Sequence, residues 1–175
     1  MSLKKLITDQ FPIGEIASFL DQISAKERLS EVQSLQKKQQ RALYELAADS
    51  VALDLNYFVP PSEPLQEVIH NGRNTLPVFT LFQKRFCRSN DGTDRIFGYN
   101  HGATTNWIGP GYFVAKATKG NPDWESKGSV VIDYYEVPNA DVVPTWPQIK
   151  ENSAGLQRLV YHQMHDFMRR VSAHV

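Results

Sequence analysis

Residues 112–137 read YFVAKATKGNPDWESKGSVVIDYYEV, and this stretch decides the fold class. Both of its ends, 112–118 and 129–137, are rich in β-branched and aromatic side chains, which favours β-strands. The intervening residues 119–128 contain Gly, Asn and Pro, which are typical of turns. Consecutive strands joined in this way indicate an antiparallel meander.

Further strands are expected on the N-terminal side of this pair. Residues 75–88 and 95–100 have similar compositions, and an Asn-Asp-Gly turn sequence lies between them at 90–92. Residues 51–59 form a weaker strand candidate. The pattern therefore predicts a curved antiparallel sheet of four to six strands.

The hairpin after residue 88 has two candidate registers. A two-residue loop would place Arg88 opposite Arg95, at a cost of up to about 1 kcal/mol unless an anion lies between them. A three-residue loop would instead pair Arg88 with Asp94, and this register is the simpler prediction.

The two ends of the chain favour helices. Residues 15–59 contain neither Gly nor Pro, and Ser-Ala-Lys-Glu at 24–27 matches a capping box, so we expect a long N-terminal helix from there to about residue 49. A short helix is expected at 62–70. A C-terminal helix is predicted over 153–175 from apolar side chains at helical spacing, which are Leu156, Val160, Met164, Phe167 and Val171.

Together these elements predict one α+β domain over residues 1–175. Its parts are a helical N-terminal segment (1–50), a mainly antiparallel strand region (51–138), a loop (139–152) and the C-terminal helix (153–175). The sheet is expected to pack against the long N-terminal helix and the C-terminal helix.

Composition and charge exclude several classes of function. Lys+Arg and Asp+Glu number 19 each, so the chain has no general attraction for nucleic acid or an anionic membrane. The single cysteine, Cys87, excludes a disulfide framework and is expected to be a buried, inert thiol. With neither a signal peptide nor a membrane span in the sequence, we expect a cytoplasmic protein. No metal site is predicted, and no particular cofactor is indicated.

Residues 101–111 form the segment with the strongest indication of function. This connection between strands is eleven residues long, where two to about five are usual. It contains Thr105, Asn106 and Trp107 and returns to the sheet at Tyr112, so these four residues are predicted to bind a small polar ligand. The alternatives are a self-packed loop in which Trp107 caps the core, and a protein contact.

Catalytic residues are harder to assign, because the common nucleotide-binding and nucleophile motifs are missing from the sequence. His101 is the only general acid or base near the loop. Asp133 would orient it if the face of strand 129–137 that carries Asp133 is buried, and either face could be. His162 and His165 are expected on a solvated helix face.

The sequence therefore favours a small-molecule site in a cleft between sheet and helices, closed by residues 101–111, with metal-independent catalysis left open. The alternative is a non-enzymatic interaction or structural domain that uses its helical surface, which could also hold a homo-oligomer together.

Overall fold

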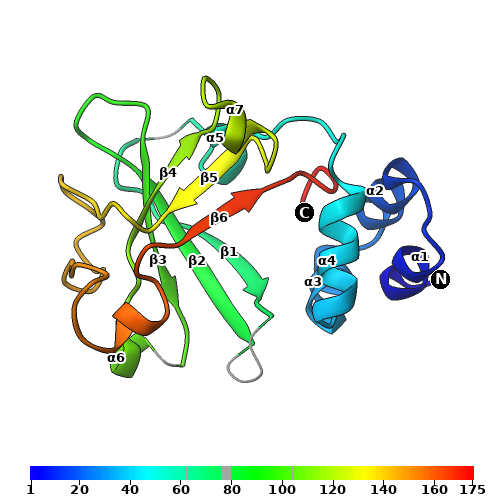
Figure 1. Cartoon of the computed structure of the whole chain (residues 1–175), viewed down its shortest axis with the longest axis horizontal. Coiled ribbons are helices and arrows are strands. Elements are labelled where there is room, and N and C mark those ends of the chain that lie inside the picture. The colour runs from blue at the N-terminus through cyan, green and yellow to red at the C-terminus, as the bar shows by residue number, and fades with distance from the viewer. Residues whose placement is uncertain (62, 76–79, 104) are drawn as a thin grey trace. The chain divides into compact units, whose positions relative to one another are not determined.

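The computed structural model describes residues 1–61, 63–75, 80–103 and 105–175. These residues form two compact units (Figure 1). The first, which we call the helical unit, contains Met1–Ala52, Gly72–Leu81 and Arg169–Val175. The second, the sheet unit, contains Leu53–Asn71 and Phe82–Met168. The expectation of one domain over the whole chain stays a prediction.

Four helices make up most of the helical unit: α1 (Leu3–Thr8), α2 (Ile13–Gln22), α3 (Ala25–Ser34) and α4 (Lys37–Leu46). They enclose an apolar core whose fully buried members include Leu3, Ile16 and Leu20. In the described parts of the chain, every helix is too short or too polar to cross a bilayer.

The expected long N-terminal helix is not found. The capping box at Ser24 starts α3 as predicted, but the chain becomes extended at Leu35, and Gln36 starts α4 with a second capping box made with Gln39. Leu35 is buried in the core of this unit. A continuous helix would have placed Gln39 on the apolar face, and the break avoids this by restarting the helix in a new direction.

The sheet unit contains nearly all of a six-stranded sheet whose strands follow the chain order, as in a meander. Each pairing from β2 to β6 is antiparallel, and the sheet is strongly curled (Figure 1). The predicted α+β class with a curved antiparallel sheet is therefore confirmed. The strands are β1 (Val68–Arg73), β2 (Leu81–Arg88), β3 (Ile96–His101), β4 (Phe113–Ala117), β5 (Val130–Asp133) and β6 (His165–Met168).

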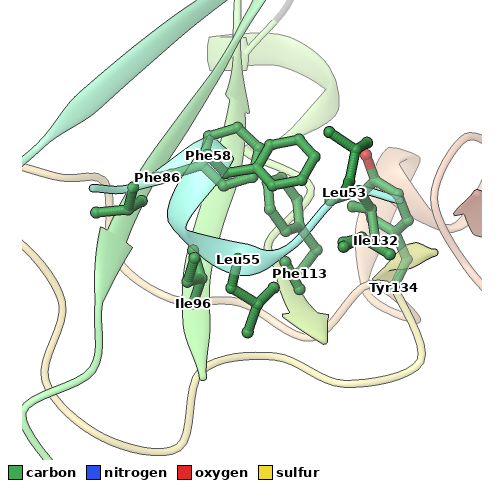
Figure 2. Packing of buried hydrophobic residues seen from close by; sticks show 11 residues of the cluster. Leu53, Leu55, Phe58, Phe86, Ile96, Phe113, Ile132 and Tyr134 are labelled. Atoms are coloured by element: carbon green, nitrogen blue, oxygen red, sulfur yellow. The ribbon is translucent and has the colours of Figure 1, made fainter. Parts of the chain in front are cut away.

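The concave face of the sheet carries a core of aromatic and aliphatic side chains, which Figure 2 shows around the short helix α5 (Leu55–Phe58). Gly98 in β3 makes this packing possible. A Cβ atom there would lie 2.5 Å from the Phe113 ring and 2.5 Å from the carbonyl oxygen of Arg85. Only glycine lets Phe113 lie across the strand at this distance.

The other face of the sheet is covered as well. Cys87, Phe97, Tyr112 and Trp146 form its core together with neighbouring residues, and residues of the 137–149 segment pack against them. Because both faces are covered, all four residues of β5 are buried. Neither face of this strand is the exposed one.

The predicted C-terminal helix is wrong. Residues Gly155–Leu159 form a short 3₁₀ helix, η1, and β6 then adds to the edge of the sheet beside β5, with Ile132 opposite Asp166. Leu156, the first member of the predicted helical stripe, is 58% exposed, so it is not part of a buried helix face. Strand pairing with a distant segment overrides the local helical spacing here.

Four smaller expectations also differ from the structure or lie partly outside the described residues. The expected helix 62–70 contains the start of β1, and the expected strand 51–59 contains α5, capped by the Asp54 side chain. Residues 76–79 of the expected strand 75–88 lie outside the described residues, and β2 begins at Leu81. In the hairpin, Arg88 lies opposite Ile96, so both proposed registers were wrong, although an Arg88–Asp94 ion pair does form at 3.2 Å.

Candidate functional site

A pocket of about 450 Å³ lies in the sheet unit, bounded on one side by the connection between β3 and β4. This side contains the short helix α6 (Thr105–Ile108) followed by Gly109 and Pro110. The opposite side is formed by residues of the 147–157 segment, including η1, which contacts α6 (orange in Figure 1). The remaining lining residues are Pro147, Gln148, Lys150, Ala154, Gly155, Leu156 and Gln157.

Two polar side chains of the pocket hold its walls in place. The Thr105 hydroxyl accepts a hydrogen bond from the Gly102 amide (2.8 Å) and donates one to the Asn100 carbonyl (3.2 Å). Gln157 is 2% exposed and joins the two sides: its Oε1 accepts from the Gly111 amide (3.3 Å), while its Nε2 donates to the Glu151 carbonyl (2.6 Å). The polar groups of both side chains are therefore used in hydrogen bonds to the backbone of the pocket walls.

Gly109 allows Gln157 to approach this closely. Its φ is +120°, and a Cβ atom would lie 2.4 Å from the Gln157 Oε1 atom. Any side chain at position 109 would separate the two walls of the pocket.

The remaining polar side chains of the pocket have hydrogen-bonding groups that can contact a ligand. Asn106, Gln148 and Lys150 are exposed and make no hydrogen bond or ion pair within the described structure. The Trp107 indole is 83% exposed, so it does not cap the core, and this alternative for the loop is not what the structure shows.

Of the predicted site residues, Thr105, Asn106 and Trp107 come together in the pocket, and the other three do not line it. Tyr112 is fully buried on the second face of the sheet, and its hydroxyl donates to the Pro147 carbonyl. His101 ends β3 and makes an edge contact with the Tyr99 ring. Burial and the nearby Arg85 charge lower the pKa of His101.

Asp133 is buried as the predicted role required, but it has other partners than His101. Its carboxylate forms an ion pair with Lys116 Nζ (2.8 Å) and lies 3.2 Å from His165 Nε2. The His165 ring lies against the rings of Tyr135 and Trp124, with centroids 4.6 and 4.9 Å away. This Asp133–His165 pair could not be seen from the sequence, because His165 was assigned to a helix.

A second polar cluster lies on the concave face, and sequence reasoning missed it. Lys84 in β2 is only 8% exposed, and its ammonium donates to Tyr134 Oη, to Asn100 Oδ1 (3.1 Å) and to Asp166 Oδ2 (3.1 Å). Burial and the Asp166 charge raise the pKa of Tyr134 well above its usual value. Alternation along β2 places Lys84 on the same face as the buried Phe86, and this was the signal available.

The residues of this Lys84 cluster also hold the end of the connection between β3 and β4. The side-chain Nδ2 of Asn100 donates to the Gly111 carbonyl (3.0 Å), and the backbone N–H of Asn100 donates to the Pro110 carbonyl (2.8 Å). Tyr161 stacks on Tyr134 at 5.5 Å and lies so close to Gly111 that a Cβ atom there would be 2.5 Å from its ring. The end of the loop at Pro110 and Gly111 is thus held by a buried network, and the Thr105 hydroxyl holds the start of α6.

No three His, Cys, Asp or Glu side chains gather as a metal site within the described ranges. Comparisons with known protein families, curated proteins and solved structures find no match to this chain, so its function has to be inferred from the pocket and the two clusters themselves.

Proposed function

We propose that this protein binds a small polar molecule in the pocket between α6 and residues 147–157. The observation that carries the proposal is the exposed Trp107 indole on the wall of a pocket whose Asn106, Gln148 and Lys150 have no partner in the described structure. Binding sites typically combine such an apolar surface with a few convergent polar groups.

The rigidity of the pocket walls also supports binding. Gln157 joins the two sides, and Thr105 fixes the start of α6, so little chain has to be ordered when a ligand enters. A preorganised site loses less free energy to ordering than a flexible one.

The proposal is for binding without catalysis. His101 and Asp133, the two residues that the catalytic version needs, are not among the residues that line this pocket. The pocket also differs in place from the cleft expected between sheet and helices, because both of its walls belong to the sheet unit.

A fragment screen followed by two-dimensional ¹H–¹⁵N NMR tests the proposal. Binders should shift the signals of the Trp107 indole N–H and of the Asn106 and Gln148 side-chain amides. Trp107→Ala removes the indole signal, and it should abolish the shifts of the Asn106 and Gln148 side-chain amides. It should change the free energy of unfolding by no more than about 0.5 kcal/mol, as surface substitutions usually do.

Leu159→Ala is the matched control, because Leu159 is equally exposed and does not line the pocket. This variant should bind fragments as the parent protein does. The proposal fails if no fragment shifts the three signals, or if Trp107→Ala binds every fragment unchanged.

A non-enzymatic interaction domain is the second candidate, and one observation favours it. Leu156 (58% exposed), which lines the pocket, and Leu159 (84% exposed), which does not, are both exposed apolar side chains of η1. Exposed apolar patches often mark protein contacts. If this surface joins two copies of the chain, sedimentation velocity will show a dimer in the parent protein that Leu159→Ala converts to monomer.

A further inference from the structure

We infer that the ligand of this pocket is a small organic anion that carries a single negative charge next to a flat apolar ring. This inference rests on the proposed function and names the class of molecule bound.

The charge follows from the ionisable groups of the pocket. Lys150 is the only ionisable side chain among its described lining residues, and no carboxylate lines it. Lys150 is exposed and makes no ion pair within the described structure. A cationic ligand would meet a like charge there, whereas an anion would gain a charge-assisted hydrogen bond.

The hydrogen-bonding groups favour the same class. Lys150 and the Trp107 indole N–H can only donate, and the Asn106 and Gln148 amides can donate as well as accept. Thr105 and Gln157, the other polar side chains of the lining, are already bonded to backbone groups. Donors therefore predominate among the groups left for a ligand, and a carboxylate has two oxygens that accept several hydrogen bonds.

The apolar part of the ligand follows from the rest of the lining. Trp107, Ile108, Pro147 and Leu156 present apolar surface beside these donors. A flat ring can stack on an indole face, which contributes more than the burial of the same apolar area alone. One cation is too few for a polyphosphate or a strand of nucleic acid, which need several.

Three probes with the same ring test the sign of the charge: 3-phenylpropionate, 3-phenylpropan-1-ol and 3-phenylpropylamine. Each is titrated by NMR at about pH 7, where the acid and the amine are fully charged. The propionate should bind about two- to fivefold more tightly than the alcohol, as expected for an exposed ion pair, and the amine should bind most weakly. Added salt should reduce the difference.

Lys150→Gln keeps a donor and removes the charge, so it should bring the affinities of acid and alcohol together. Lys119→Gln is the matched control, because it makes the same charge change at an exposed position outside the pocket. It should leave the preference for the acid intact.

The outcomes separate the two proposals. The anion inference is overturned if the three probes bind with equal affinity, if the amine binds most tightly, or if the preference for the acid survives Lys150→Gln. None of these results contradicts the proposal that the pocket binds a ligand. Binding of other fragments at Trp107 but of none of these probes would overturn the ring-bearing anion in the same way. If neither the probes nor any screened fragment shift the Trp107 signal, both proposals fall together.

Discussion

The ion pair between Lys84 and Asp166 allows a quantitative prediction, because its two members are buried to different extents. The Lys84 side chain is 11% exposed, whereas the Asp166 side chain is 38% exposed. Asp166→Asn leaves a buried ammonium without a counter-charge. Breaking a fully buried pair costs about 3–5 kcal/mol, and the partial exposure of Asp166 screens this pair, so we expect a loss of about 2–3 kcal/mol.

Lys84→Met should lower the free energy of unfolding less than Asp166→Asn does. The carboxylate that it leaves behind is already reached by water, and the Tyr134 hydroxyl keeps its 3.0 Å hydrogen bond from Asn100 Nδ2. We expect a loss of about 1–2 kcal/mol. The double variant Lys84→Met/Asp166→Leu removes both charges and keeps apolar volume, so it should lie within about 1 kcal/mol of the parent protein.

Urea unfolding followed by tryptophan fluorescence measures these differences. The three tryptophans, Trp107, Trp124 and Trp146, all belong to the sheet unit, so the signal reports on the unit that contains the pair. The reasoning is refuted if Asp166→Asn is no more destabilising than Lys84→Met, or if the double variant is as unstable as Asp166→Asn.

Three further predictions concern a glycine, a tyrosine and the cysteine of the sheet unit. Gly111→Ala should destabilise the sheet unit by about 2–3 kcal/mol in urea unfolding, because φ is +54° and the new Cβ atom would lie 2.5 Å from the Tyr161 ring. Gly120→Ala is the comparison, because φ is +93° there but the space around it is open. It should lower the free energy of unfolding by only about 1–2 kcal/mol. Burial raises the pKa of Tyr161 to about 12, above the value of about 10 in an unfolded chain. The contribution of Tyr161 to the free energy of unfolding is therefore complete below pH 10 and is lost as the pH rises to 12. Tyr161→Phe should flatten the plot of stability against pH over this range, and an unchanged slope would contradict the assignment. Burial also raises the pKa of Cys87 to about 11, so at about pH 8 its thiol should react with Ellman's reagent only at the rate of unfolding, and fast labelling of the native protein would show that the thiol is accessible.

The sheet could be predicted where local sequence determines it. Residues 95–100, 112–118 and 129–137 combine β-branched and aromatic side chains with flanking turn residues, and each overlaps a strand of the structure. The C-terminal segment could not be predicted in this way. β6 is four residues long and exists because β5 pairs with it, and no local pattern encodes a partner more than thirty positions away.

The same division between local and distant information applies to the candidate site. Thr105, Asn106 and Trp107 were found because one long connection contains them all. The opposite wall was assigned to the end of a loop and the start of a helix, so Lys150 and Gln157 could not be placed against α6. Asp133 and His165 are 32 residues apart in sequence, and only the antiparallel register of β5 and β6 puts them opposite one another.

The buried amide of Gln157 has a kinetic consequence. Since it holds the Gly111 amide and the Glu151 carbonyl at once, the two walls are already joined before any ligand arrives. A molecule that enters meets a formed surface and need not wait for a loop to close, so its association should be a single step limited by encounter and orientation. Ligands of different affinity would then differ mainly in how long they stay, and residence time would be the quantity that selection or design can adjust in this pocket.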